Sequence, residues 1–497
     1  MVDKKREASR RFKRLGDALG LRPGKAYLPR RSRSVPVRRP PLLLAVLLVV
    51  GCFGPSPGGH GGDGPGPAVA FPELVVDHDH KDPRLHNASV GLRLAGFADA
   101  ALVLGTELGR FSDIQFWEST AIVTVNGRAG APGGGFVVLD LSTTPTPTVV
   151  GRYRSGSEDN WYTKISPDGR FVFLTANGNG NPATAAGSLA QGGSPLRGIH
   201  IVDVRNPRQP ALVGFLPAPV RVVNLAVWTN VDKAVLVAAS MVNERAGLTA
   251  GPAETKDQNY VGLYEFVPPV DLPNGQKQPA ELQEVSRWRP TDATGVRNAF
   301  PHDLAVGTHP LNGKTLLFVA YWDAGGYILD VTDPTRPAQA SHVPPMGATD
   351  HVHTFKPHAK LIAGKYYAAL APETFGAEAA GFHRLIEITD ARKPQVVGAW
   401  TPPPGDLVNP EPLLFSPHEF HLANERLYAS QFHAGVWVLQ LPSMEPISMW
   451  QASQGTPERT GDWAVDVSQA VWYRGHLYAV DMANGILILD EDDVPFA

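Results

Sequence analysis

Short apolar runs that follow a glycine or a turn recur along the chain, and most of them end at an aspartate. The clearest are GFVVLD (135–140), GIHIVD (198–203), GYILD (326–330), HRLIEITD (383–390), GVWVLQ (435–440) and GILILD (485–490). Runs of this length, rich in Val, Ile and Leu and bounded by turn residues, are typical of buried β-strands. The pattern predicts an all-β fold assembled from one repeated unit.

Each repeated unit contains four such runs separated by turns, which predicts four strands per unit. When the first runs are aligned, the equivalent positions are Ser112, Trp161, Val223, His302, His353, His418 and Ser468. Their spacings of 49, 62, 79, 51, 65 and 50 residues approach the roughly 40–50 residues of a propeller blade, with insertions such as 177–196 and 241–260 between second and third strands. Seven blades fit best. Six or eight stay open because the first and third units follow the repeat poorly.

The last unit ends near Asp490 without a fourth strand, whereas residues 90–96 (VGLRLAG) form an isolated strand ahead of the first unit. Pairing of this N-terminal strand into the last blade would close the ring. Closure removes the unpaired sheet edges that otherwise promote aggregation. We therefore predict a propeller that is closed by its N-terminal segment.

Three of the apolar runs are followed by similar segments, namely VRNPRQPALVG (204–214), VTDPTRP (331–337) and ARKPQVVG (391–398). An apolar strand, an aspartate, a Pro-containing turn and a second short strand together resemble the LVIVD repeat, which builds β-propeller blades. The resemblance covers about residues 88–492. It implies a surface or secreted propeller and assigns no reaction, because fold alone does not set function.

Composition and charge exclude several classes of protein. The chain has 50 Gly and 46 Pro among 497 residues, which disfavours a mostly helical fold. A single cysteine excludes an intramolecular disulfide and zinc sites of the Cys₄ or Cys₂His₂ type. Residues 1–51 carry 14 Lys or Arg and 3 Asp or Glu, so the remainder of the chain has a net charge of −14. An acidic body argues against binding to nucleic acid.

The basic N-terminal segment is typical of an export signal. Residues 42–50 (LLLAVLLVV) are too short to span a bilayer as a helix and suit the core of a signal peptide. The run VVGC (49–52) resembles a bacterial lipobox, and it contains the only cysteine, Cys52. We predict a signal peptide (1–51), a Gly/Pro-rich tether (52–87) and a propeller (88–497). The resemblance implies lipidation of Cys52 and anchoring at the outer membrane or cell surface.

Histidines occupy the same repeat position in three consecutive units: His302, His353 and His418. The first strand of a blade lines the central channel, so these side chains are expected to meet at one channel mouth. The second strand returns to the same face and brings Asp323, Glu373 and His433. His351 shares a strand face with His353 and is an alternative to it, whereas His421 faces away from His418 unless a bulge intervenes.

Imidazole and carboxylate groups together are a ligand set for a transition metal such as copper or zinc. Hydrated polar residues without a metal are the competing interpretation. The first functional hypothesis is a lipid-anchored extracytoplasmic propeller that binds a protein or small molecule. The alternative is a metal-dependent enzyme, since selenium-binding proteins and methanethiol oxidases are similar in architecture. By that resemblance, His302, His353 and His418 would ligate copper while Glu373 or Asp323 acts as ligand or proton acceptor. Motifs of common hydrolases, nucleotide-binding proteins and zincins are absent.

Overall fold

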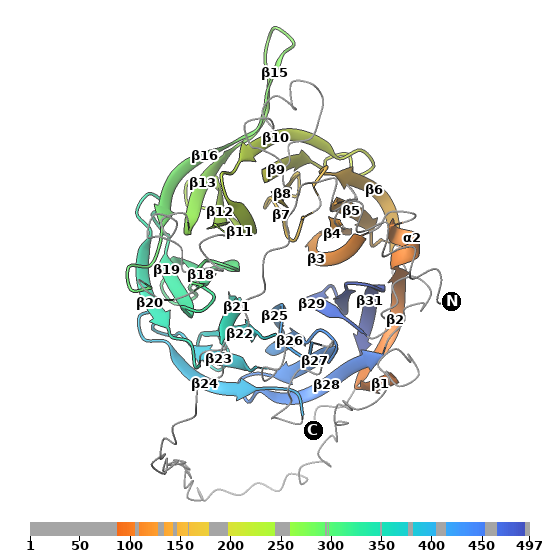
Figure 1. The fold of residues 1–497 in the computed structure, drawn as a ribbon, viewed down its shortest axis with the longest axis vertical. Helices are drawn as coiled ribbons and strands as arrows, with labels where there is room; N and C mark the ends of the chain where they lie inside the picture. The colour runs from red at the N-terminus through yellow and green to blue at the C-terminus, as the bar shows by residue number, and fades with distance from the viewer. Residues whose placement is uncertain are drawn as a thin grey trace, which may run out of the picture. The chain divides into compact units, whose positions relative to one another are not determined.

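Seven antiparallel β-sheets surround a common axis, so the fold is a seven-bladed β-propeller (Figure 1). The computed structural model describes residues 87–492 apart from 105–108, 128–133, 143–146, 158, 178–196, 244–258, 294–295, 297, 348–349, 376–380, 404–413 and 453–464. The all-β class and the seven four-stranded blades predicted from the repeat are confirmed.

The first five blades follow one another along the chain, and in each the strands are hydrogen-bonded in sequence order. Blades 1 and 2 contain β3 (Gly109–Trp117), β4 (Thr120–Gly127), β5 (Gly135–Asp140), β6 (Thr148–Arg154), β7 (Thr163–Ile165), β8 (Phe171–Asn177), β9 (Arg197–Asp203) and β10 (Ala211–Pro217). Blade 3 contains β11 (Arg221–Thr229), β12 (Val235–Val242), β13 (Tyr260–Val267) and β16 (Glu281–Trp288), with the small hairpin of β14 (Val270–Asp271) and β15 (Lys277–Gln278) projecting from it. Blades 4 and 5 contain β17 (Leu304–Thr308), β18 (Thr315–Ala320), β19 (Gly326–Asp330), β20 (Ala338–Val343), β21 (His351–Pro357), β22 (Tyr367–Glu373), β23 (His383–Glu387) and β24 (Gln395–Trp400).

The N-terminal strands join the last two blades. Blade 6 contains β25 (Phe420–Ala423), β26 (Arg426–Ser430), β27 (Val436–Gln440) and β28 (Glu445–Ala452), and blade 7 contains β29 (Val467–Tyr473), β30 (His476–Asp481) and β31 (Gly485–Glu491). The fourth strand of blade 7 is β2 (Leu92–Asp99), which confirms closure by the N-terminal segment. The strand preceding it, β1 (Asn87–Val90), adds a fifth strand to blade 6, which the sequence did not predict.

Apolar side chains pack between neighbouring blades, and this packing continues across the closure. One cluster joins Phe111, Ile114 and Val123 of blade 1 to Val480 and Ile488 of blade 7. All five side chains are buried. A short helix, α2 (Ala100–Leu104), links β2 to blade 1, and Arg152 of β6 donates to the Leu104 carbonyl. The ring is therefore held together at its closure by side chains as well as by strand pairing.

The structure explains the glycine and the aspartate of the repeat. Gly135 and Gly485 are the first residues of the third strands β5 and β31, and Gly198 is the second residue of β9. Their φ angles are +148°, +145° and +145° for Gly135, Gly198 and Gly485. A Cβ atom there would lie 2.0–2.2 Å from a backbone oxygen of the neighbouring fourth strand. The aspartate at the end of the third strand stabilises the turn that follows, because its side chain accepts a hydrogen bond from the backbone NH two residues later. Asp330 Oδ1 accepts from Thr332 at 3.1 Å. Asp203 accepts in the same way from Arg205, and Asp140 from Ser142.

Replacement of Gly198 by alanine is expected to lower the free energy of unfolding by about 2 kcal/mol or more, because it adds a steric clash to an unfavourable φ. The midpoint of chemical denaturation measures this loss. Gly275→Ala is the matched control: Gly275 also has positive φ, +78°, and has nothing within 4 Å of the added Cβ. Equal losses in the two variants would contradict the steric explanation.

Candidate metal centre at the channel mouth

The aligned repeat positions coincide with irregularities in the first strands. The strand register shifts between Phe111 and Ile114, between Val222 and Leu225, between Val352 and Thr354, and between Val467 and Gln469. In blade 4, Ala320 NH donates to the Asp303 carbonyl and Ala320 O accepts from His302 NH. His302 and Asp303 therefore both pair with Ala320, which is the arrangement of a β-bulge. Blade 6 repeats this pattern with Ser430, Glu419 and His418. A β-bulge changes the direction of the side chains at its position.

The rings of the three aligned histidines lie side by side in one row, tilted to one another by 44° and 40°. The ring centroids of His302 and His353 are 4.2 Å apart, and those of His353 and His418 are also 4.2 Å apart. Burial, with the neighbouring His418, lowers the pKa of His302 to about 3. Burial also lowers the pKa of His353 well below its usual value, and it lowers that of His418. All three imidazoles are therefore neutral at pH 7, which is the form that ligates metal ions.

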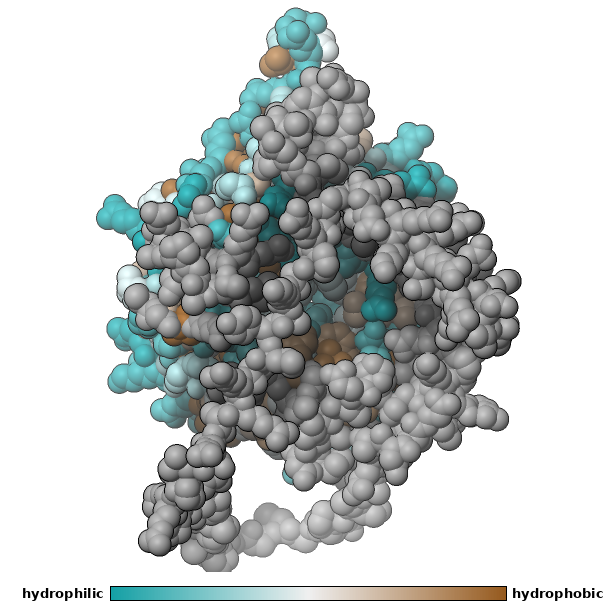
Figure 2. Space-filling model, in the orientation of Figure 1, coloured by the Kyte–Doolittle hydropathy of each residue, from teal (hydrophilic) through white to brown (hydrophobic). Residues whose placement is uncertain are grey.

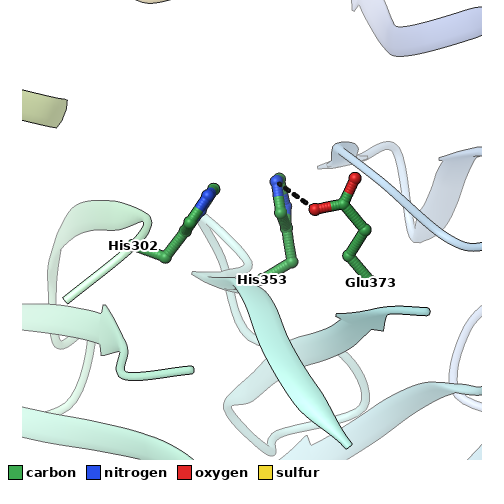
Figure 3. A group of neighbouring side chains, drawn as sticks. All are labelled: His302, His353 and Glu373. Carbon is green, nitrogen blue, oxygen red and sulfur yellow. Dashed lines mark ion pairs between the residues drawn. The ribbon is translucent and has the colours of Figure 1, made fainter. Parts of the chain in front are cut away.

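Glu373 completes a compact group with two of these histidines. The Oε2 atom of Glu373 lies 3.7 Å from Nε2 of His353. Candidate ligand atoms of His302, His353 and Glu373 all lie within 4.8 Å of one another, and the three side chains project in the same direction from their backbones (Figure 3). Burial, together with Glu419, raises the pKa of Glu373 to about 8. A tetrahedral zinc ion with bonds near 2.1 Å separates its ligand atoms by about 3.4 Å, so the group needs only small movements to close on an ion.

Two further observations concern the ligand nitrogens. Nδ1 of His302 is buried and has no hydrogen-bond partner among the described residues. Nδ1 of His353 is 2.8 Å from the hydroxyl oxygen of Thr354, so its Nε2 is the atom facing Glu373. A hydrogen bond at one ring nitrogen fixes the orientation of the other, as is usual for histidines that bind metals.

His418 adjoins this group without belonging to it. Its Nδ1 lies 2.6 Å from the backbone oxygen of Ser468, so Nδ1 carries the proton and donates. Its ring packs against Phe432 as well as His353. His421 lies on β25, which begins two residues after His418, and its Nδ1 accepts from the backbone NH of Trp472, apart from the group.

Asp323 and His433 lie outside the group because the predicted alignment of the second strands differs by one residue from the structure. In blades 4, 5 and 6, the second-strand residues that face the bulge are Ala320, Ala371 and Ser430. The residues two positions after them are Trp322, Glu373 and Phe432, respectively. Asp323 and His433 come three residues after Ala320 and Ser430, one position too far along the chain. Their equivalent in blade 5 is Thr374, not Glu373. Aromatic rings thus occupy the positions of blades 4 and 6 that correspond to Glu373.

The displaced residues have other partners. Oδ1 of Asp323 contacts Nδ1 of His351, and His351 stacks on Trp322 with centroids 5.4 Å apart. Nδ1 of His433 lies 3.2 Å from both backbone polar atoms of Leu414. The choice between His351 and His353 left by the strand alternation is resolved geometrically, since the bulge at His353 directs that side chain into the group.

A ring of polar residues lies one position further along the first strands, and the sequence reasoning missed it. It contains Asp113, Tyr162, Asn224, Asp303, Thr354, Glu419 and Gln469, all buried. Neighbours are hydrogen-bonded across blades: Gln469 donates to Asp113 at 2.9 Å, and Asn224 donates to Asp303 at 2.5 Å. The signal was available in the same alignment, because the residue after each aligned position is polar. We call this set the channel floor.

Lys356 of β21 supplies the positive charge of the channel floor. Its Nζ contacts Oε2 of Glu419 and lies 4.0 Å from Asp303. Burial opposes its charged form, but the carboxylates of Glu419 and Asp303 raise its pKa above the usual value. The phenol of Tyr162, from blade 2, donates to Oε1 of Glu419, from blade 6, at 3.2 Å. A residue of blade 2 is thus bonded directly to a residue of blade 6, next to His353.

Comparison with known families agrees with the architecture. A sequence model of the LVIVD repeat matches residues 316–343. The chain is therefore a β-propeller that contains an LVIVD repeat in its fourth blade. The matched residues form the second, third and fourth strands of blade 4 and include the turn that carries Trp322. No curated protein matches the chain with significant similarity. The match covers three strands of blade 4, and the chemistry of the channel mouth has to be argued from the residues there.

The predicted lipidation site, Cys52, and the tether lie outside the described residues. Within the part of the chain that the structure describes, none of the helices is long and apolar enough to cross a membrane. Most of the insertions at 177–196 and 241–260 are likewise not described, but the flanking strands show that both join second to third strands of their blades, as expected.

Proposed function

We propose that this LVIVD propeller is a lipid-anchored, extracytoplasmic binding protein whose channel mouth holds a transition metal ion, zinc or copper. The lipobox-like run that ends at Cys52 supports export and anchoring. The neutral imidazoles of His302 and His353, with the carboxylate of Glu373, support metal binding. The acidic charge of the mature chain argues against a nucleic-acid partner.

The observation that carries the proposal is the convergence of three metal-ligating side chains from two blades. His302 precedes β17, His353 lies on β21 and Glu373 ends β22. Their candidate ligand atoms lie within 4.8 Å of one another. Two histidines and one glutamate are a known ligand set of zinc, and imidazole also suits copper.

Metal binding by the full chain tests this proposal. One zinc or copper ion per chain is expected by mass spectrometry after loading and desalting, and His353→Ala should lower the affinity at least tenfold. His433→Ala is the matched control, because His433 is a buried channel-face histidine that lies outside the group. An unchanged affinity in His353→Ala, or an equal loss in His433→Ala, would refute the site.

The anchor has a separate test. Cys52→Ala should move the protein from the membrane fraction to the soluble fraction of fractionated cells, because a lipoprotein cysteine carries the acyl chains that hold the domain at the bilayer. Cys52→Ser is a second variant of the same position and should behave alike. Membrane association that persists in both variants would exclude lipid anchoring through this residue.

A metal-dependent enzyme is the second candidate, and one feature favours it. Three protein ligands leave a fourth position of a tetrahedral ion for water or substrate, which distinguishes catalytic zinc sites from structural ones. The similarity to selenium-binding proteins and methanethiol oxidases suggests assays for oxidase activity with copper and hydrolase activity with zinc. Turnover by the loaded chain that is lost in His353→Ala would favour the enzyme over a binding protein.

A further inference from the structure

We infer that the metal ion at His302, His353 and Glu373 binds a monoanionic ligand that carries an apolar or aromatic body. This inference rests on the proposed metal site and concerns its remaining coordination position. The ligand class follows from the side chains on the other blades at the channel mouth, from the closed channel floor and from the charge of the site.

The residues at the channel mouth differ in polarity from one side to the other. We call His302, His353 and His418 the polar arc, and Trp161 and Val223 the apolar arc. Blades 4, 5 and 6 contribute His302, His353 and His418, whereas blades 2 and 3 contribute Trp161 and Val223 at the equivalent positions. Val223 is buried with Tyr162 and Val242 in one cluster, against which Trp161 and Phe300 pack. Where surface is visible at the centre of the ring, hydrophobic and hydrophilic areas lie side by side (Figure 2).

The apolar arc reaches the metal ligands through stacked aromatic rings. Phe300 stacks on Trp322 with a centroid distance of 5.2 Å and an interplanar angle of 20°. Trp322 in turn lies 4.9 Å from the ring of His302. A ligand bound to the ion therefore has the rings of Phe300 and Trp322 beside His302 and the side chains of Trp161 and Val223 beyond them. Burying an apolar body there is favourable by about 25 cal/mol for each Å² removed from water.

The channel floor prevents such a body from extending along the axis. Tyr162 from blade 2 donates to Oε1 of Glu419 from blade 6, which lies 4.0 Å from Nδ1 of His353, and Glu419 also contacts Lys356. Tyr162, Glu419 and the neighbouring Asp303 are buried. A ligand that reaches the ion from the mouth must therefore lie against the apolar arc.

The charge of the site selects a monoanion. A divalent ion bound by neutral His302 and neutral His353 would displace the proton of Glu373, and the complex with the resulting carboxylate keeps a net charge of +1. In the channel floor, Lys356 lies against the carboxylates of both Glu419 and Asp303, so the floor adds no net positive charge to the site. Because an uncompensated charge in a mostly buried site is costly, the open position favours a donor with a single negative charge, such as a carboxylate, phenolate or hydroxamate.

Two hydroxamates that share one metal-binding group test the inference. Calorimetric titration of the zinc-loaded full chain is expected to show benzohydroxamate binding at least tenfold more tightly than acetohydroxamate. Trp161→Ala should reduce this ratio to about threefold or less and leave the zinc content and the affinity for acetohydroxamate unchanged. Val223→Ser should act in the same direction and serves if the tryptophan variant does not fold.

Trp117→Ala is the control, since Trp117 lies at the opposite end of the first strand of blade 1 from the channel mouth. It should leave the ratio unchanged. Equal affinities for the two hydroxamates in the zinc-loaded protein, or a preference that survives both mouth variants, would overturn the apolar-ligand inference while leaving the metal site intact. Failure to load zinc would instead refute the proposed function, and with it this inference.

Discussion

Replacing Lys356 with methionine is expected to lower the free energy of unfolding by about 3–5 kcal/mol, because it leaves the buried carboxylate of Glu419 without its counter-charge. Glu419 is 1% exposed and its carboxylate contacts the Lys356 ammonium. Burial raises the pKa of Glu419, but Lys356 more than reverses this effect and holds the pKa below its usual value. Removal of the ammonium therefore leaves a buried carboxylate that keeps the hydrogen bond from Tyr162 but has lost its counter-charge.

The chain offers a matched surface pair for comparison. Lys365 Nζ lies 2.7 Å from Glu387 Oε2, with a lysine side chain that is 54% exposed. Lys365→Met should leave the denaturation midpoint unchanged within error, because exposed ion pairs contribute little. The double variant Lys356→Met/Glu419→Gln should recover part of the stability lost in Lys356→Met, since it removes the unpaired charge. Similar midpoints for Lys356→Met and the wild type would contradict a stabilising role for the channel floor.

Removal of the closing strand is expected to have an effect as large as the whole stability of a domain. A chain that lacks residues 1–99 loses β2, whose seven paired positions complete blade 7. Leu92 and Ala98 of this strand are buried. At roughly 1 kcal/mol for each ladder hydrogen bond and about 2 kcal/mol for a buried leucine, the loss exceeds about 5 kcal/mol. The truncated chain should be largely unfolded or aggregated by circular dichroism and gel filtration.

The control for this truncation removes residues 1–69 and retains β1 and β2. It should fold with the same denaturation midpoint as a Cys52→Ala full-length chain. A synthetic peptide spanning residues 87–104 should restore folded protein when added to the refolding chain that lacks 1–99. A monomeric, cooperatively folded protein without residues 1–99 would show that closure by β2 is dispensable.

The blade architecture was predictable because one local pattern recurs in most of the blades. The apolar third strand, its initial glycine and its terminal aspartate each have a local steric or hydrogen-bonding cause, as at Gly198 and Asp203. The repeat period then counts the blades. The missing fourth strand after Asp490 indicated closure, whereas the pairing of β1 with blade 6 has no counterpart in the repeat and was not predicted.

The candidate site was predictable only in part. The alignment of first strands identified His302 and His353, because equivalent positions on neighbouring blades converge. The placement of Asp323 and His433 from the second strands was wrong, because predicting which side chain lies at the end of a second strand requires the strand register to within one residue. Lys356 was missed for a related reason: it follows the bulge at His353, and strand alternation counted from the sequence does not show that its side chain enters the channel.

The most direct test of the metal centre is crystallography of the zinc-loaded protein, with anomalous data collected on both sides of the zinc absorption edge. One anomalous peak within about 2.0–2.2 Å of nitrogen atoms of His302 and His353 and an oxygen of Glu373 is the predicted result. A zinc-soaked crystal with no peak among these three side chains, or with zinc bound only elsewhere, would contradict the proposed site.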